Sequence, residues 1–255
     1  MIHPQYIMTA DEQLFPSKTR CSFLQYMPNK HHKFGIKFWL LVDVDSKYLC
    51  NGFPYLGKNE QRPDDDTLLE NVVMRLAAPY LNKGRNMTTD NFFTTVKVGN
   101  KLKEKDTSLV GTMKHDRKEI PNTIKTMKNP LYTEKQNKNA LLYSTMHSDV
   151  EVKTSTKRLP ETIRFHNWIK FAVDVIDQMA RKYSVRSRTR GWSVHVFHNI
   201  LDLTAINSWI VFKGVTGQKI SRRNFILQLA EELHAEYVES RKQSYSTEDE
   251  DRVEE

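Results

Sequence analysis

The sequence is poor in cysteine, with only Cys21 and Cys50 in 255 residues. Two thiols cannot form the disulfide framework of a small secreted protein or a cysteine-based zinc ligand set. No run approaches the roughly 18 apolar residues that span a bilayer, and the first residues have neither the basic nor the apolar region of a signal peptide. We therefore expect a soluble, intracellular protein in a reducing compartment.

The composition indicates a folded chain with a very polar surface. Hydrophobic residues make up 38% of the sequence and charged residues 27%, which is sufficient for a core but leaves much charge outside it. A chain of this length can bury one substantial core. We predict one domain over residues 1–240, in which 114–167 form an insertion or long connection, followed by an acidic disordered tail at 241–255.

Positive charge is in excess over the body of the chain. The formal net charge is +8, although residues 244–255 hold six acids and one arginine, so that the remainder carries +13. A body this basic concentrates polyanions, and nucleic acid is the commonest polyanion inside cells. Charge alone leaves ribosomal or chaperone-like binding open.

Hydrophobic periodicity predicts strands and helices along the whole chain. Two β-rich runs flank Asp45-Ser46-Lys47, which is typical of a hairpin turn. A segment at 194–212 is apolar nearly all round, which predicts a buried helix. The expected elements are a short first strand ending near Asp11, a hairpin at 36–44 and 48–55, a helix at 67–81, a short strand before Asp90, a helix at 92–102, strands at 108–113 and 140–146, and helices from 168, at 194–212 and at 222–238.

Four aspartates lie where the local pattern changes. Asp11 follows the first strand, Asp90 separates a strand from a helix, and Asp174 and Asp177 share one helix face because they are three residues apart. Carboxylates from distant segments can hold two Mg²⁺ ions at a scissile phosphate, since hard cations prefer oxygen ligands. Each acid also has a structural explanation, such as a helix N-cap at Asp90 or an ion pair between Asp177 and Arg181.

With these residues in place, the sequence resembles the piggyBac transposase family over about residues 8–240. The resemblance rests on several short blocks that occur in one order, and a single block would be weak evidence. They are TADEQL (9–14), YMPNKHHKFGIK (26–37), NGFPYLG (51–57), TDNFFT (89–94), LVGT (109–112), KEIP (118–121) and VDVIDQM (173–179).

The resemblance implies an α/β fold of the RNase H-like (DDE/D transposase) type, in which helices flank a mixed sheet and an insertion precedes the third catalytic aspartate. It assigns catalysis and metal binding to Asp11, Asp90 and Asp174, with Asp177 as the accompanying fourth acid. It implies two Mg²⁺ or Mn²⁺ ions, double-stranded DNA with short inverted repeats and TTAA targets as partner, and a nuclear location. A zinc module and a membrane are not expected, and a homodimer stays open.

A basic segment follows the last acids and resembles the family's DNA-proximal segment that ends in tryptophan. For Trp192, ordinary core packing is an equally weighted alternative. The predicted DNA-binding residues are Arg181, Arg186, Arg188, Arg190 and Trp192.

The sequence also departs from the family pattern. The family has Thr-Lys-Gly-Gly-Val-Asp where this chain has residues 169–174, and Phe171 in place of glycine is expected to crowd the backbone beside Asp174. The family's DNA-binding and dimerisation segment before the first acid and its cysteine-rich zinc module after the core are not found. The chain therefore resembles a truncated or degenerate copy.

Three alternatives to an active transposase remain. A catalytically inactive remnant would bind DNA without cutting it, through Lys97, Lys101 and the basic segment. Residues 42–45 (VDVD) match a nucleotide-sugar transferase metal motif, although aspartate is common in hairpin turns. His195, His198 and Asp202 have zinc-like spacing, but structural histidines fit a buried helix better.

Overall fold

The computed structural model describes residues 7–57, 67–123, 133–135, 138–139, 141–147, 160–189 and 191–251. The chain divides into two compact units, Met1–Leu203 and Thr204–Glu255. The first unit carries the sheet and all four predicted acids. In the described part of the chain, no helix is both long and apolar enough to span a membrane.

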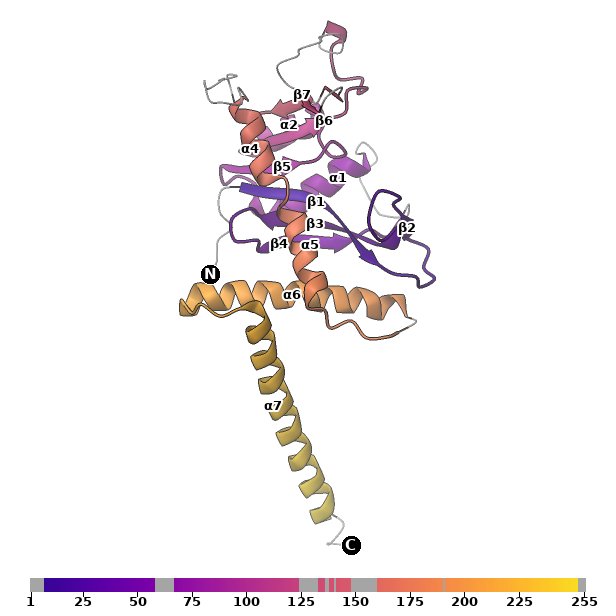
Figure 1. Cartoon of the computed structure of the whole chain (residues 1–255), viewed down its shortest axis with the longest axis vertical. Coiled ribbons are helices and arrows are strands. Elements are labelled where there is room, and N and C mark those ends of the chain that lie inside the picture. Colours follow the sequence, from indigo (N-terminus) through magenta and orange to yellow (C-terminus); the bar gives the residue numbers. More distant parts are fainter. Residues whose placement is uncertain are drawn as a thin grey trace. The chain divides into compact units, whose positions relative to one another are not determined.

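A mixed sheet organises the first unit (Figure 1). Seven strands of the described residues form it in the order β2-β3-β1-β5-β6-β9, and β4 also pairs with β3. The strands β1, β5 and β6 run parallel, whereas β3 and β9 are antiparallel to their neighbours. The strands are β1 Ile7–Pro16, β2 Leu24–Tyr26, β3 Phe34–Asp43, β4 Leu49–Pro54, β5 Arg85–Thr89, β6 Thr107–Met113 and β9 Leu141–Ser144, with a separate pair β7 Thr133–Lys135 and β8 Lys138–Asn139.

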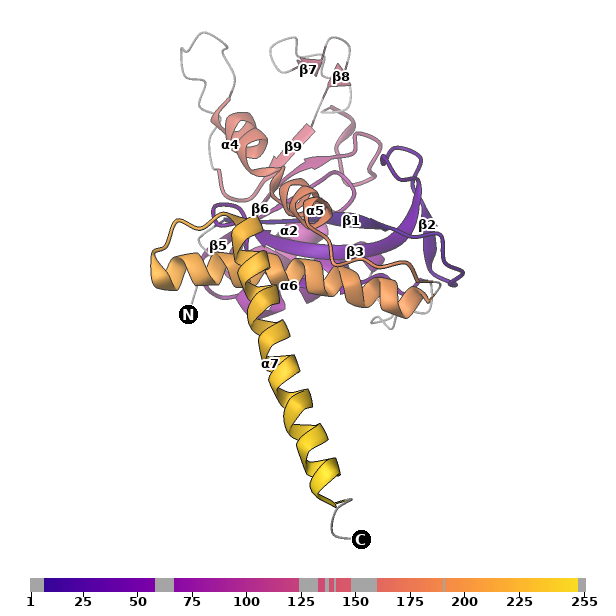
Figure 2. The same cartoon turned by 60° about the horizontal axis from the view of Figure 1, so that its bottom comes forward.

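Helices cover both faces of the sheet, as Figures 1 and 2 show. On one face, α1 and α2 pack on a core that includes Trp39, Leu76, Val98 and Leu109. On the other face, α5 contacts β1 and β3 through its buried apolar side. The helices of this unit are α1 Leu68–Ala77, the short 3₁₀ helix η1 Ala78–Tyr80, α2 Val96–Lys103, α4 Glu161–Ile169, α5 Ala172–Lys182 and the beginning of α6 Trp192–Thr216.

The second unit contains the end of α6 and the helix α7 Arg222–Asp251. Gly217, with a φ of 68°, separates the two helices. The indole N–H of Trp209 donates to the carbonyl of Ile220 at 3.0 Å, and the rings of Phe212 and Phe225 lie 5.3 Å apart. These contacts close the turn within this unit.

The observed elements confirm the predicted mixed α/β sheet with flanking helices and the predicted hairpin, which is β3–β4. Three details differ. The helix α4 begins at Glu161, inside the segment predicted as an insertion. The first turns of α6 expose Phe197 (56%) and Ile200 (47%), so this helix is buried on one side only. The helix α7 continues to Asp251, whereas the sequence predicts a disordered tail from residue 241.

A close approach at Gly111 connects the sheet to the loop that follows β5. Thr89 and Gly111 are opposite each other in the parallel β5–β6 pair. The hydroxyls of Thr89 and Thr94 are 2.8 Å apart, and the Thr94 hydroxyl donates to the carbonyl of Asp90 at 2.7 Å. A Cβ atom on Gly111 would meet this Thr94 hydroxyl and lie 2.6 Å from the Thr89 carbonyl oxygen. Glycine therefore allows the loop that carries Asp90 to close on β6.

We predict that Gly111→Ala lowers the free energy of unfolding by about 1–3 kcal/mol, as is usual when a methyl group is forced into a packed core. Urea denaturation measures the change. The control is Gly191→Ala, because a Cβ there would lie 3.6 Å from the nearest atom, the Cγ2 of Val194, which is ordinary van der Waals contact. A Gly111→Ala protein as stable as the parent would contradict the close approach.

Candidate metal and catalytic site

Parallel pairing brings two of the predicted acids side by side. The register of β1 and β5 pairs Ala10 with Thr89, so that Asp11 and Asp90 come next on neighbouring strands. Asp90 directly follows β5, as predicted. Asp11 lies in the middle of the ten-residue strand β1, not at the end of a short one, because β1 continues to Pro16 along β3.

A cluster of three carboxylates results. Asp11, Glu12 and Asp90 each place one carboxylate oxygen within 4.8 Å of the others, and all three are half-buried. Glu12 is not among the acids predicted from the sequence, and side chains of successive residues in a regular strand face opposite sides of the sheet. Its position next to Asp11 was the available signal. Glu12 also forms an ion pair with Lys30, at 3.8 Å.

Electrostatics makes this cluster a high-energy arrangement in the absence of a cation. Burial raises the pKa of Asp11 well above its ordinary value, and the negative charges of Glu12 and Asp90 raise it further. Burial and the charge of Glu12 also raise the pKa of Asp90. This effect is opposed at Asp90 by backbone N–H donors from Phe92 at 3.0 Å and Phe93 at 3.3 Å.

Lys37 supplies a positive charge beside the acids. Its ammonium lies 3.9 Å from the centroid of the Trp39 ring and 5.0 Å from that of Phe92. Burial lowers the pKa of Lys37, while the charges of Glu12, Asp90 and Asp11 act in the opposite direction. The aromatic rings therefore hold this ammonium where it partly offsets the carboxylate cluster.

Asp174 lines the same cavity as Asp11 and Asp90, a space of about 260 Å³. It lies in the first turn of α5 and is exposed to solvent. The hydroxyl of Thr9 donates to the carbonyl of Ile169 at 2.9 Å, which ties the last residue of α4, just before α5, to β1. The structure thus brings three of the four predicted acids around one cavity, with Asp174 on its open side.

Asp177 occupies a neighbouring position. It accepts a hydrogen bond from the Gln13 side chain at 2.9 Å and forms an ion pair with Arg181 at 2.5 Å. It lines a separate cavity of about 220 Å³ and is not among the residues around Asp11. The other end of the Gln13 amide accepts from Asn199 at 2.9 Å. The structure therefore places Asp177 in a network between β1, α5 and α6, and its metal role stays a prediction.

Phe171 does not crowd the backbone, contrary to expectation. Its φ of −93° is available to any residue, so no glycine is needed there. The side chain is 52% exposed and lines the cavity that holds Asp174. The ammonium of Lys170 lies 5.1 Å from the centre of its ring. Phe171 therefore adds an aromatic surface at the mouth of the acidic cavity.

The donor set around the cavity fits a hard divalent cation. Its nearest groups are carboxylate oxygens, which Mg²⁺ and Mn²⁺ prefer, and neither cysteine is close enough to join them. The raised pKa of Asp11, caused first by burial and then by the charges of Glu12 and Asp90, is consistent with this, because a bound cation would favour the ionised carboxylate. The residues around this cavity are therefore suited to binding Mg²⁺ or Mn²⁺.

The residues predicted to bind DNA are distributed unevenly. Arg186 and Arg188 are exposed after α5, whereas Arg181 is engaged by Asp177. Trp192 is 41% exposed and packs edge-on against Phe23, with ring centroids 5.0 Å apart. Arg190 lies outside the described residues.

The alternative site residues have structural partners. The ammonium of Lys97 lies 2.8 Å from buried Glu70, and Lys101 lies 3.5 Å from the same carboxylate. The carboxylate of Asp43 accepts hydrogen bonds from the backbone and hydroxyl of Ser46, which closes the β3–β4 turn. Asp202 accepts from the backbone N–H of Val185 at 2.8 Å. In the described residues, His195, His198 and Asp202 do not form a metal-ligand group.

We predict that Mg²⁺ or Mn²⁺ raises the melting temperature of the chain, and that the rise is larger at pH 8 than at pH 6. A raised carboxyl pKa means that proton binding stabilises the fold at low pH, and that this stability is lost as pH rises through the folded pKa. Metal binding requires the deprotonated acid and so grows over the same range. At about 100 times Kd, the cation would add about 2.7 kcal/mol.

The matched variant for this measurement is Asp11→Asn. Without metal it should melt at a higher temperature than the parent at pH 8, because it removes the repulsion, and it should lose the response to metal. Differential scanning fluorimetry at both pH values tests this. A parent chain indifferent to both cations would contradict the metal site.

Comparison with known proteins agrees with this geometry. The model of the Transposase IS4 family matches residues 1–209. The cryo-EM structure of a piggyBac transposase synaptic complex with hairpin DNA is similar over 94% of this chain, with a TM-score of 0.85 and 29% sequence identity. The chain spans about half, 54%, of the length of that transposase. Its sheet and flanking helices have the RNase H-like catalytic architecture of piggyBac, and the chain belongs to the Transposase IS4 family of DDE transposase domains.

Proposed function

We propose that this chain is a catalytic core for DNA strand cleavage and strand transfer, dependent on divalent metal. The observation that carries the proposal is the convergence of Asp11, Asp90 and Asp174 on one cavity from β1, the end of β5 and the start of α5. Family membership supports the same chemistry. The separation of these residues along the sequence makes a purely local structural role a poor explanation.

In this proposal the three aspartates hold the cations, and Glu12 completes the negative charge of the cluster. Two Mg²⁺ or Mn²⁺ ions, when bound, would polarise the scissile phosphate and lower the pKa of an attacking hydroxyl. The N–H groups of Phe92 and Phe93 orient the Asp90 carboxylate, so that one oxygen stays fixed while the other is available. The Lys37 ammonium, held over Trp39, limits repulsion among the acids before a cation arrives.

The reaction proceeds by two in-line displacements at phosphorus. In the first, a water oxygen forms a bond to phosphorus, the bond to the 3′-oxygen breaks, and that oxygen leaves with a proton as a 3′-hydroxyl. In the second, this hydroxyl loses its proton, attacks a phosphate of the target strand and expels another 3′-oxygen. The number of phosphodiester bonds is conserved in the second step, so no energy source is required.

Double-stranded DNA is the proposed partner. Support comes from the excess positive charge of the body and from the similar transposase, which was solved with hairpin DNA. TTAA targets, short inverted repeats at the substrate ends and a nuclear location belong to the same proposal. Arg186 and Arg188 are the exposed arginines proposed to contact the phosphate backbone.

We assign Asp177 a positioning role in addition to its proposed membership of the acid set. It connects Arg181 and Gln13, and Gln13 follows the Asp11-Glu12 pair on β1. Loss of this carboxylate would leave Gln13 and Arg181 without the partner that links α5 to β1. The consequence would be a shift of Asp174 relative to Asp11.

A catalytically inactive DNA-binding protein is the second candidate function. The observation in its favour is the ion pair of Asp177 with Arg181, which engages the fourth acid of the family pattern. Such a protein would bind duplex DNA with steep salt dependence and show no aspartate-dependent heat of Mg²⁺ binding in calorimetry. Metal-dependent nicking of duplex DNA separates the two candidates.

We predict that the chain nicks a duplex carrying a transposon end when Mg²⁺ or Mn²⁺ is supplied, and that Asp90→Asn lowers the rate by about 10²–10³-fold, the usual effect of removing a preorganised electrostatic group. A denaturing gel of end-labelled DNA measures the product. The control is Asp106→Asn, an exposed acid with a φ of 47°, a conformation that asparagine tolerates. Equal nicking by Asp90→Asn and the parent would remove the aspartates from the mechanism.

A second prediction separates Asp174 from Asp177. Asp174→Asn should lower the nicking rate as much as Asp90→Asn, because both line the cavity of Asp11. Asp177→Asn should lower it by about 10–100-fold, the range for groups that orient a metal ligand. Titrating Mn²⁺ in each variant gives the apparent metal affinity beside the rate. Full activity of Asp174→Asn would exclude it from the site.

A further inference from the structure

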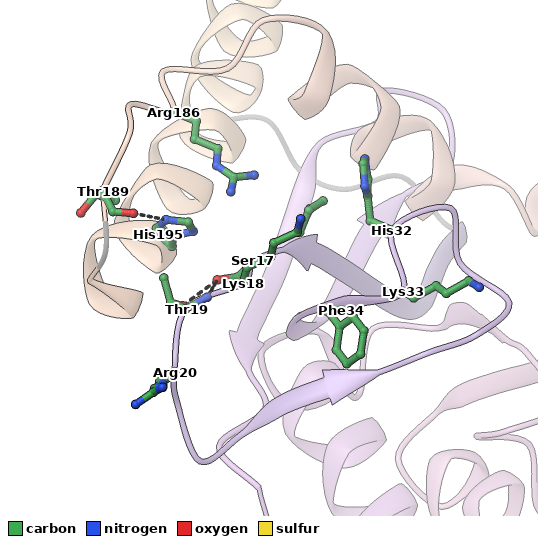
Figure 3. Close-up of a pocket in the computed structure, with 11 residues that line it drawn as sticks. Ser17, Lys18, Thr19, Arg20, His32, Lys33, Phe34, Arg186, Thr189 and His195 are labelled. Atoms are coloured by element: carbon green, nitrogen blue, oxygen red, sulfur yellow. Dashed lines mark hydrogen bonds between the residues drawn. The ribbon is translucent and has the colours of Figure 1, made fainter.

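A second, larger cavity lies beyond the carboxyl end of β1. Its volume is about 770 Å³, within the range of roughly 300–1,000 Å³ that holds small organic ligands. Figure 3 shows it bounded by the segment after β1, the segment before β3 and the segment that leads into α6. The lining side chains that matter here are Lys18, Arg20, His32, Lys33, Phe34 and Arg186. We call this cavity the basic hollow.

The basic hollow is electropositive. Four of its lining residues are Lys18, Arg20, Lys33 and Arg186, and among the described residues no carboxylate lines it. Within the described part of the chain, no ion pair joins any of these four to an acid. The pKa of His32 is lowered by burial first and then by His31, Arg181 and Arg186, while the charge of Asp177 acts in the opposite direction. Uncompensated cations around a concave surface are suited to phosphate groups.

An exposed aromatic surface adjoins these charges. The Phe34 ring is 51% exposed, and the Tyr26 ring beside it is 57% exposed. Their centroids lie 4.8 Å apart and the rings are tilted by 41°. The two residues are paired across β2 and β3, so their positions are set by strand hydrogen bonds. Aromatic rings next to cations are the combination with which proteins hold unpaired nucleotides, because every base has a face that stacks.

A buried histidine adds a hydrogen-bonding group without a partner. His195 lines the hollow, is 5% exposed, and places Nε2 3.2 Å from the carbonyl oxygen of Thr189. In a neutral imidazole, Nε2 must then carry the proton, and Nδ1 is an acceptor. Nδ1 has no hydrogen-bond partner among the described residues.

From these observations we propose that the basic hollow binds an unpaired nucleotide of the DNA substrate, with its phosphates on Lys18, Arg20, Lys33 and Arg186 and its base on Phe34. This inference rests on the proposed function and deepens it, because it specifies the form of the DNA. Five residues of β1 separate Asp11 from Pro16, a distance of about 17 Å. The bound nucleotide would therefore lie along the same strand of the sheet as Asp11, a few positions from the scissile phosphate.

The experiment is fluorescence anisotropy of a labelled 12-nucleotide single strand and of the matching blunt duplex, with the full chain in EDTA. We expect Phe34→Ala to weaken single-strand binding about tenfold or more, the usual loss when one stacking ring is removed, with duplex binding within about twofold of the parent. Phe34→Tyr keeps an aromatic ring at this position and should bind the single strand as the parent does. Equal losses for both DNA forms, or no loss for either, would overturn the proposal.

Charge variants and controls complete the test. For Arg20→Gln with Lys33→Gln, we expect a shallower plot of the logarithm of single-strand affinity against the logarithm of salt concentration. Its slope should fall in magnitude by about 0.7 for each cation removed. The matched control is Lys103→Gln with Lys105→Gln, two exposed lysines at the end of α2 and in the turn before β6, which is several strands away from β2 in the sheet order. An equal effect of the control pair would overturn the proposal, since it would assign binding to net charge. Melting temperatures of all variants, and the Phe34→Tyr rescue, exclude misfolding as the cause.

Asp90→Asn separates this inference from the proposed function. This variant should bind the single strand as the parent does, because the assay contains no metal and Asp90 does not line the hollow. If nicking is absent but Phe34→Ala still selectively weakens single-strand binding, the proposed catalysis is contradicted and nucleotide binding in the basic hollow is supported. If metal-dependent nicking is present but Phe34→Ala binds both DNA forms like the parent, only the hollow fails.

Discussion

Repulsion among closely spaced carboxylates is the interaction on which the site depends. The parallel pairing of β1 with β5 is stabilised by backbone hydrogen bonds and by apolar side chains such as Met8 and Met87, which are fully buried. That pairing forces Asp11 and Asp90 next to each other whether or not a cation is present. The stability of the sheet therefore maintains an electrostatic cost that a divalent cation can remove. The carboxylates are therefore already in position for a metal, and the fold without metal is less stable as a result.

The helix α5 determines whether the third acid joins the other two. Its position depends on a buried apolar side, on the hydrogen bond from Gln13 to Asp177, and on that from Thr9 to Ile169 at the end of α4, just before α5 begins. Both contacts begin on β1, on either side of Asp11. The same strand thus carries one acid of the site and the groups that position the helix with another. This arrangement explains why Asp177 is important to the geometry without lining the acidic cavity.

Opposite charges are gathered at two places along β1. Its middle carries Asp11 and Glu12, and the segment after its end carries Lys18 and Arg20. A nucleic acid strand that crosses both would meet cations for its phosphates at one place and metal ligands at the other. The separation by strand residues keeps the lysine and arginine from neutralising the acids directly. Under the proposed function, the sheet separates the residues that would attract DNA from the residues that would act on it.

The sequence by itself determined the type and order of most elements, because apolar periodicity and turn residues are local properties. It identified the β3–β4 hairpin, the strand before Asp90 and the helix that carries Asp174. The resemblance to piggyBac, which the family match and the structural similarity support, gave the RNase H-like sheet and the aspartates. The apolar pattern predicted that α6 is buried all round, but one side of it is exposed. Burial depends on what packs against a helix, which the local sequence does not contain.

Only the tertiary structure decided which acids meet. Helical spacing places Asp174 and Asp177 on one face of the helix, yet one lines the cavity of Asp11 and the other pairs with Arg181. Glu12 joined the cluster although strand alternation directed it away, and Phe171 turned outward where crowding was expected. The basic hollow is assembled from three segments that are distant in sequence. Distances between remote side chains depend on strand register and helix position, and neither is encoded in any single segment.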